Sequence, residues 1–372
     1  MKSLQHEAPT DDFTLDSVEM YVDDLTAGKA VWCDHYGFAE VAVGGSPEQG
    51  FRSVMLSQGA MRLVLTEATD ERHPAASYVL SHGDGVADIT LRTSDVRRAF
   101  AQAVERGCRP VTEPRTHEGE DVELTATVAG FGDVVHTLVQ RPDSDRGLPP
   151  GFRWLPGAAP AAGRRREKGM LLAMDHFAVC LNIGELDPTV DFYTSVFGFR
   201  EIFEERIVIG SQAMLSKVVQ SRDGTVTFTM IQPDPTAEAG QIDEFLKNHD
   251  GAGVQHIAFA AEDVVQAVET LSGRGVEFLT TPGAYYRSLG ERVTLSKHTL
   301  EGLRELNILV DEDHGGQLFQ IFTRSTHARR TLFFEVIERC GAETFGSSNI
   351  RALYEAVETE RLTRARTGAG LA

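Results

Sequence analysis

The segment MDHFAV at residues 174–179 has the composition of a buried β-strand, although it contains an aspartate and a histidine. Two later segments share this pattern, GVQHIAF at residues 253–259 and LFFEVI at residues 332–337. Each places one side chain that can bind a metal, His176, His256 or Glu335, within an otherwise apolar run. Burying such a group without a partner is unfavourable, so each position requires a structural or chemical reason.

The strand that contains His176 belongs to a unit that occurs four times. Each copy has a short strand, a helix and then a glycine that turns the chain into the next strand, with helices expected near residues 26–35, 96–106, 188–196 and 264–274. From a fixed strand position to this glycine the copies span 20, 19, 22 and 19 residues. The pairs are Ser17 and Gly37, Asp88 and Gly107, His176 and Gly198, and His256 and Gly275. This regular spacing indicates an internal repeat.

The stretches after each glycine alternate apolar and polar residues, as in MRLVL at 61–65 and VTFTM at 226–230, which predicts further strands. We therefore expect an α+β fold of tandem βαβββ repeats, in which two units form one module with a cup-shaped mixed sheet. Residues 1–140 are predicted to form a module without metal ligands, and residues 170–372 a module with the metal site. Residues 141–169, rich in Pro, Gly, Ala and Arg, are predicted as a linker.

The C-terminal segment at residues 349–364 is predicted to be an amphipathic helix. Its apolar residues recur at three- and four-residue spacing, which places them on one helix face. We expect this helix to act as a lid over the metal site, although a role in core packing remains an alternative. The residues on the predicted face are Ile350, Leu353, Tyr354 and Val357.

The two histidines occupy matching positions in the third and fourth units, and a pseudo-two-fold relation would bring them together. The first and second units have Ser17 and Asp88 at these positions, so the N-terminal module should bind no metal. Two imidazoles and one carboxylate are the ligand set of non-haem Fe(II) oxygenases, and they leave adjacent iron positions open. We therefore predict one Fe(II) per chain, bound by His176, His256 and Glu335.

The overall composition excludes several classes of partner. The 372 residues carry 36 basic and 55 acidic side chains, a formal charge of −19, which disfavours nucleic acid and anionic membranes. No run is apolar enough to span a membrane and no signal peptide is visible, so a cytoplasmic protein is expected, with oligomeric state left open. The cysteines are expected as free thiols, and several histidines as surface residues. These are Cys33, Cys108, Cys180 and Cys340, and His249, His298, His314 and His327.

The repeat and its ligands resemble the vicinal oxygen chelate superfamily. The segments GAGVQHIA at 251–258, GQLFQIFT at 316–323 and FFEVIER at 333–339 resemble its branch of 4-hydroxyphenylpyruvate dioxygenases and 4-hydroxymandelate synthases. This resemblance implies 4-hydroxyphenylpyruvate and O₂ as substrates, with His176, His256 and Glu335 as iron ligands. It also implies a substrate pocket lined by matching residues. These are Ser216, Thr229, Ile231, Gln241, Gln255, Gln320, Phe322, Phe333, Phe345 and Ile350.

Two departures from the dioxygenase pattern favour the mandelate synthases. The dioxygenases usually carry an asparagine where this chain has Ile231, and a phenylalanine where it has Ile350. The expected reaction is oxidative decarboxylation and benzylic hydroxylation of 4-hydroxyphenylpyruvate to 4-hydroxymandelate and CO₂. By resemblance, this product would supply a hydroxyphenylglycine precursor of a peptide natural product.

Three alternatives stay open. The first is a dioxygenase that forms homogentisate from the same substrate. The second is a metal-free binding protein of the same fold, which the three ligands disfavour. The third is a glyoxalase-type isomerase, which would normally require a fourth protein ligand, and no further strand-embedded carboxylate stands out in the sequence.

Overall fold

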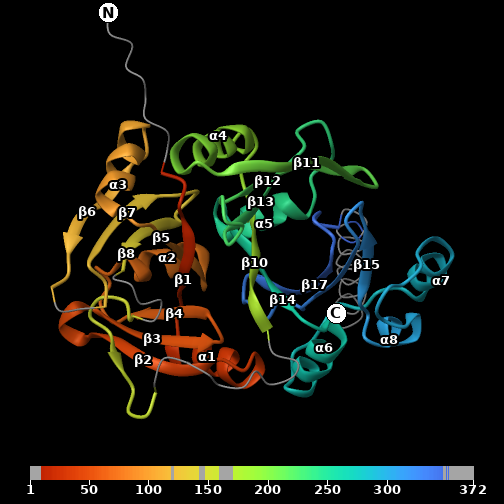
Figure 1. Ribbon diagram of the computed structural model, residues 1–372, viewed down its shortest axis with the longest axis horizontal. Coiled ribbons are helices and arrows are strands. Elements are labelled where there is room, and N and C mark those ends of the chain that lie inside the picture. The colour runs from red at the N-terminus through yellow and green to blue at the C-terminus, as the bar shows by residue number, and fades with distance from the viewer. Residues whose placement is uncertain are drawn as a thin grey trace, which may run out of the picture.

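The computed structural model describes residues 10–118, 121–141, 147–158, 171–346, 349 and 351. In this part of the chain two mixed sheets stand side by side, with helices packed around and between them (Figure 1). The first sheet has the strand order β6-β7-β8-β5-β1-β4-β3-β2-β9, and the second has the order β11-β12-β13-β10-β14-β17-β16-β15. We call residues 10–158 the first module and residues 171–351 the second module.

The elements of the first module follow the predicted order. Its strands are β1 (Thr14–Tyr21), β2 (Ala39–Ser46), β3 (Phe51–Gln58), β4 (Met61–Ala68), β5 (Gly85–Arg92), β6 (Pro110–Thr116), β7 (Leu124–Ala129), β8 (Val135–Gln140) and β9 (Arg153–Trp154). Its helices are α1 (Leu25–Ala30), the π-helix η1 (Val31–His35), the 3₁₀-helix η2 (Pro47–Gln49), α2 (Pro74–His82) and α3 (Val96–Glu105).

The second module repeats this arrangement with two additional helices before its last three strands. Its strands are β10 (Leu171–Cys180), β11 (Arg200–Ile209), β12 (Gln212–Gln220), β13 (Thr227–Pro233), β14 (Gly253–Ala261), β15 (Leu309–Glu312), β16 (Gln317–Phe322) and β17 (Phe333–Cys340). Its helices are α4 (Leu186–Phe197), α5 (Gln241–His249), α6 (Val264–Gly273), α7 (Gly283–Arg292) and α8 (Leu300–Glu305).

The predicted α+β fold of βαβββ repeats is confirmed. In each module the first strands of the two units pair antiparallel at the centre, β1 with β5 and β10 with β14. The last strand of each unit then pairs parallel with one of them. The four repeat glycines have φ values of +74°, +92°, +66° and +93°, a left-handed conformation that glycine adopts without strain. They are Gly37, Gly107, Gly198 and Gly275.

The two modules share one continuous buried core. The ring of Trp32 in η1 lies 4.8 Å from that of Phe334 in β17, and Phe13 lies 5.2 Å from Phe197 in α4. The imidazole of His136 in β8 lies 2.6 Å from the hydroxyl of Tyr193 in α4. Since these contacts are buried and partly polar, they fix how one module lies against the other.

Part of the predicted linker extends the first module. Residues 147–158 include β9, which pairs antiparallel with β2, and Leu148, Phe152 and Trp154 pack on the sheet beside Val41. The remainder of the linker, Ile350 and the apolar face of the predicted lid helix lie outside the described residues. Within the described ranges, no helix has the length and apolar character needed to cross a bilayer, and all four cysteines are free.

Candidate metal centre

The centre of the second sheet brings together the three predicted metal ligands. Ala258 in β14 is the cross-strand partner of both His176 in β10 and Glu335 in β17. His256 pairs with Ala178, two residues further along β10. Because residues two apart share one face of a strand, all three ligand side chains project from the same face of the sheet.

The ligand atoms of this cluster converge on one point. One atom from each of His176, His256 and Glu335 lies within 4.8 Å of the others. The Glu335 carboxylate oxygen Oε2 is 3.4 Å from Nε2 of His176 and 3.3 Å from Nε2 of His256. All three residues are buried, with Glu335 only 1% exposed. A carboxylate this deeply buried requires a positive partner.

A bulge in β10 allows the residue before His176 to reach its imidazole. The pairing steps from Met174–Phe259 to His176–Ala258, so Asp175 is an extra residue without a partner. Such a bulge breaks the alternation of side chains along the strand. Asp175 Oδ1 lies 2.8 Å from Nδ1 of His176. With the proton on Nδ1, the nitrogen Nε2 is free to bind a metal.

The electrostatics of the cluster match a site for a cation. Burial disfavours the charged form of His176, but the carboxylates of Glu335 and Asp175 raise its pKa to about 9. Burial would raise the pKa of Glu335, but the two histidines lower it to about 2. In the metal-free protein a proton on His176 therefore balances the buried carboxylate, and a divalent metal can replace that proton.

His256 is held mainly by packing. Its ring is stacked on that of Phe333 at 4.8 Å between centroids, and Phe322 approaches it edge-on at 6.0 Å. Its Nδ1 atom is buried and has no hydrogen-bond partner among the described residues. Burial lowers the pKa of His256, although the hydrogen bond and charge of Glu335 oppose this effect. The neutral imidazole is the form that binds metals.

The residues present fit a metal of the non-haem iron type. Two neutral nitrogens and one carboxylate oxygen from three adjacent strands form a facial set with an open side. The second Glu335 oxygen, Oε1, accepts a 2.7 Å hydrogen bond from Nε2 of Gln320 in β16. This bond leaves Oε2 directed at the two histidines.

Several of the predicted pocket residues lie around this site. Thr229 in β13 pairs with Ala178, which lies on the ligand face of β10, so the side chain of Thr229 projects from the same face. Ile231 lies two residues further along β13 and therefore shares this face. Ser216 in β12 is paired with Ile231 and is also buried. Phe345 meets the ring of His176 edge-on at 5.3 Å. The hydroxyl of Thr229 is buried without a partner among the described residues, so it is available to a ligand.

For two other predicted pocket residues, Gln255 and Gln241, strand register alone does not place the side chain on the ligand face. Gln255 is the extra residue of a second bulge, between the pairs Ala178–His256 and Val179–Val254, and this bulge interrupts the alternation at its position. Gln241 is the first residue of α5, a helix that packs beside Ile231 through Ile242 and Phe245.

Sequence reasoning did not identify Asp175 and Arg339 as part of the site. Arg339 donates through Nε and Nη2 to both carboxylate oxygens of Asp175, each at 2.9 Å. Burial would raise the pKa of Asp175, but hydrogen bonds from His176 and Arg339 hold it well below its usual range. An aspartate directly before a ligand histidine was the available signal in the sequence.

The predicted surface position of His249 is wrong. His249 is 4% exposed, and its ring is stacked on that of His82 in α2 at 4.4 Å between centroids. His82 Nδ1 also lies 2.6 Å from the backbone oxygen of His249. This contact between α2 and α5 joins the modules, and burial lowers the pKa of His249 to about 4.

A second group of possible ligands is already satisfied by protein partners. Asp263, His298 and Glu338 place ligand atoms within 4.8 Å of one another. The Glu338 carboxylate forms an ion pair with Lys297 and accepts hydrogen bonds from the backbone of Val264 and from His298. Because the lysine neutralises it, this cluster acts as a structural ion pair. His298 is partly buried there, contrary to its predicted surface position.

Among its described residues, the first module has no equivalent triad. The register places Ser17, Asp88 and Thr137 at the positions of His176, His256 and Glu335. Asp88 accepts hydrogen bonds from the backbone and side chain of Thr137, and it pairs across the strands with Glu19. Burial raises the pKa of Asp88 to about 6. This polar interior has no imidazole at either matching position.

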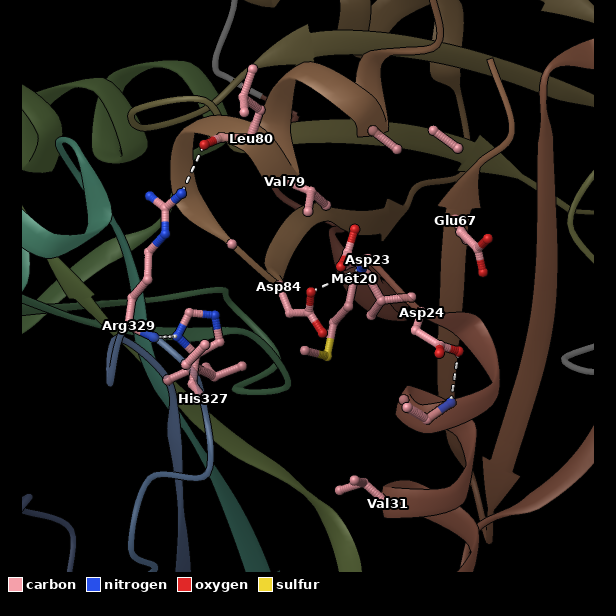
Figure 2. A pocket seen from close by; sticks show the side chains of 18 of the residues that line it. Met20, Asp23, Asp24, Val31, Glu67, Val79, Leu80, Asp84, His327 and Arg329 are labelled. Carbon is pink, nitrogen blue, oxygen red and sulfur yellow. Dashed lines mark hydrogen bonds between the residues drawn. The ribbon is translucent and has the colours of Figure 1, made fainter. Parts of the chain in front are cut away.

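A large cavity lies between the modules, separate from the metal centre. It has a volume of about 1130 Å³, and none of the three ligands lines it. Figure 2 shows acidic side chains of the first module, including Asp23, Asp24 and Asp84, on one wall. On the other side Arg329 donates to the backbone oxygen of Leu80 (Figure 2). We place the chemistry at the triad, because the convergent buried ligands are there.

Comparisons with known proteins agree with this geometry. A model of the Glyoxalase/Bleomycin resistance protein/Dioxygenase superfamily matches residues 14–143 and 173–321. The 4-hydroxyphenylpyruvate dioxygenase of Yarrowia lipolytica is 30% identical over 364 residues, covering 94% of this chain and 92% of that protein. That of Dictyostelium discoideum is 30% identical over 361 residues, covering 94% and 98%.

The fold and the triad thus define an oxygenase of the vicinal oxygen chelate type. The chain belongs to the Glyoxalase/Bleomycin resistance protein/Dioxygenase superfamily and, within it, to the family of the 4-hydroxyphenylpyruvate dioxygenases. It is similar to a solved variant of 4-hydroxymandelate synthase from Streptomyces coelicolor. That structure has 43% sequence identity and a TM-score of 0.85, with 95% of this chain and 100% of that chain covered. The family resemblance seen in the sequence is therefore confirmed.

Proposed function

We propose that this enzyme converts 4-hydroxyphenylpyruvate and O₂ to 4-hydroxymandelate and CO₂ with Fe(II) bound by His176, His256 and Glu335. The observation that carries this proposal is the buried triad with Ile231 on the same concave face. When bound there, Fe(II) would supply open positions for an α-keto acid and O₂ and the redox chemistry of oxidative decarboxylation.

The ligand residues each have a defined task. The nitrogens Nε2 of His176 and His256 and Oε2 of Glu335 would hold the metal. Asp175 fixes the tautomer of His176 by accepting the proton on Nδ1. Gln320 occupies Oε1 of Glu335 and so favours one carboxylate oxygen as the ligand.

The walls beside the triad suit an aromatic substrate. Ile231, Phe322 and Leu309 belong to one buried apolar cluster, against which Phe333 packs. Such a wall excludes water and holds a ring by dispersion and burial. The unpaired hydroxyl of Thr229 and the buried Ser216 offer polar contacts at its edge. The site would therefore orient a phenol whose keto acid end reaches the metal.

Position 231 supports hydroxymandelate as the product. An asparagine at this position could hold a polar group of the substrate, whereas the branched alkyl side chain of Ile231 cannot. A ring without that anchor can turn, and a displacement of about 1 Å at the reacting carbon can change a rate about 100-fold. We infer that the turned ring presents its benzylic carbon for hydroxylation. The similarity to a 4-hydroxymandelate synthase structure supports the same product.

The second candidate is a dioxygenase that forms homogentisate, which the names of the curated relatives favour. The deciding experiment is incubation of the purified protein with Fe(II), O₂ and 4-hydroxyphenylpyruvate, followed by chromatographic product identification. Hydroxymandelate supports the proposal, and homogentisate as the sole product overturns the product assignment. Absence of turnover would overturn the proposed substrate.

Free thiols and the acidic composition support a cytoplasmic location.

A further inference from the structure

We propose that Arg339 is a positioning residue, which acts through Asp175 to fix the imidazole of His176 and thereby sets the affinity for metal. The first module contains an equivalent aspartate–arginine pair, Asp16 and Arg141, and we further infer that this pair positions no metal ligand. The inference rests on the proposed function only in that the triad binds a divalent metal.

The bulge in β10 is what makes the pair useful to the ligand. Neighbouring side chains on a regular strand point to opposite faces, so a residue next to His176 would normally not reach its ring. At the bulge, Asp175 contacts Nδ1 of His176 and the guanidinium of Arg339 at the same time. The position of the Asp175 carboxylate, and with it the orientation of the His176 ring, therefore depends on Arg339.

Arg339 is itself held in place by the chain that follows β17. Its Nη1 atom donates to the backbone oxygens of Ala342 and Thr344, at 3.3 and 2.6 Å. Its guanidinium carbon lies 5.0 Å from the centre of the Phe345 ring, and this ring meets His176 edge-on. Contacts thus lead from His176 through Asp175, Arg339 and Phe345 back to His176, and they restrain the imidazole from two sides.

The first module contains the same pair at equivalent positions. Asp16 is the extra residue of a bulge in β1, between the pairs Leu15–Leu91 and Ser17–Thr90. Arg141 follows β8 by one residue and donates through Nε and Nη2 to both oxygens of Asp16, at 2.7 and 2.8 Å. Its Nη1 donates to the backbone oxygen of Leu148, as that of Arg339 does to Ala342 and Thr344.

The comparison separates an architectural role from a chemical one. The pair ties the bulged strand to the chain after the last strand in both modules, so it belongs to the repeat. Only in the second module is the aspartate followed by a histidine, since Ser17 occupies the matching position in the first. Loss of Arg339 would remove the two donors that hold the Asp175 carboxylate against Nδ1 of His176. The imidazole of His176 would then lose the restraint on its orientation.

The test compares Arg339→Met with its matched control Arg141→Met in the full-length protein. The readouts are the affinity for Co(II), the visible spectrum of the bound Co(II), and the thermal midpoint of the metal-free protein. We expect both variants to lower the thermal midpoint. Only Arg339→Met should weaken Co(II) binding, by about 10- to 100-fold, and change the Co(II) bands. Arg339→Lys keeps the positive charge but not the two parallel donors of the guanidinium, so its Co(II) affinity should lie between those of wild type and Arg339→Met.

Equal Co(II) affinity in Arg339→Met and wild type would overturn the inference, as would an equal loss in both methionine variants. If Arg339→Met does not fold, Asp175→Asn takes its place, because it removes the ion pair and retains an acceptor for Nδ1. Unchanged Co(II) binding and spectrum in Asp175→Asn would again overturn it. These readouts require no turnover, so a wild type that makes homogentisate corrects the proposed product and leaves the positioning pair intact.

Discussion

Gln320 donates a 2.7 Å hydrogen bond from its amide to Oε1 of Glu335, so one carboxylate oxygen is occupied while the other faces both histidines. Gln320→Leu removes this donor and leaves Oε1 buried without a partner. We expect the free energy of unfolding to fall by about 1–3 kcal/mol and metal binding to weaken. Calorimetric titration with Co(II) and thermal melts measure the two effects.

The matched control is Gln317→Leu on the same strand. Gln317 is also buried and makes hydrogen bonds through its amide, but its partners are Ser296, Thr294 and Glu312, away from the triad. It should lose similar stability and keep the wild-type affinity for Co(II). A parallel loss of affinity in both variants would show that Gln320 acts only through stability.

Metal stoichiometry tests the difference between the modules. We expect one equivalent of Fe(II) or Co(II) per chain, because the first module has Ser17, Asp88 and Thr137 in place of the ligands. His256→Ala should abolish binding and turnover while the far-ultraviolet circular dichroism stays unchanged. A second equivalent in the wild type, or full binding by His256→Ala, would contradict the assignment.

The interior of the first module should titrate near neutral pH. Burial and the charge of Asp88 raise the pKa of Glu19 to about 7, against a hydrogen bond from Thr66. Between the unfolded pKa near 4.5 and this value, the folded state holds a proton that the unfolded state releases. Stability is therefore lost as pH rises through this window, by up to about 3 kcal/mol.

Glu19→Gln isolates this contribution, because every other group is common to both proteins. Chemical denaturation at pH 5 and pH 8 should show the variant gaining relative to wild type at the higher pH. A constant difference between the two proteins would mean that Glu19 is ionised over the whole range.

The contact between His136 and Tyr193 should weaken in acid. Burial lowers the pKa of His136 to about 4, although the hydrogen bond to the backbone oxygen of Ile89 opposes this. The unfolded chain takes up a proton near pH 6.5, so stability is lost as pH falls from 6.5 towards 4, by up to about 3 kcal/mol. His136→Gln can keep both hydrogen bonds and should lose this acid dependence in denaturation at pH 7 and pH 4.5. An unaltered acid dependence would assign the loss to other groups.

The sequence allowed the repeat and the triad to be predicted because both depend on local pattern. Strand segments, glycine turns and matching positions are visible along the chain, and the register of β10, β14 and β17 agrees with the placement of His176, His256 and Glu335. The bulge at Asp175 was not predictable, because one extra residue opposite a partner strand leaves no periodic signal.

Contacts between segments far apart in the chain could not be predicted from the sequence either. Arg339 lies 164 residues from Asp175, and Tyr193 lies 57 residues from His136. His249 has a polar neighbourhood in sequence, yet its burial depends on α2 of the other module. Such pairings follow from how strands pack within a module and how the modules pack on each other, which a single sequence does not encode as a local pattern.

Product choice should respond to Ile231, one of the two positions where the sequence resembles the mandelate synthases more than the dioxygenases. Ile231 is 4% exposed and faces the same concave surface as Thr229 and Ser216. Ile231→Asn places an amide where these hydroxyls can reach it, which should anchor the ring with its substituted carbon towards the metal. We expect decarboxylation to continue, because the ligands are untouched, and homogentisate to appear beside hydroxymandelate.

The variant Ile231→Val is the control, since it changes volume without adding a polar group. It should give hydroxymandelate alone, at a stability cost of about 1 kcal/mol. Ile350→Phe, at a position outside the described residues, should raise the homogentisate share further when combined with Ile231→Asn. The measurement is the product ratio by chromatography at matched turnover. Pure hydroxymandelate from the double variant would rule out pocket shape at these two positions as the cause of product choice.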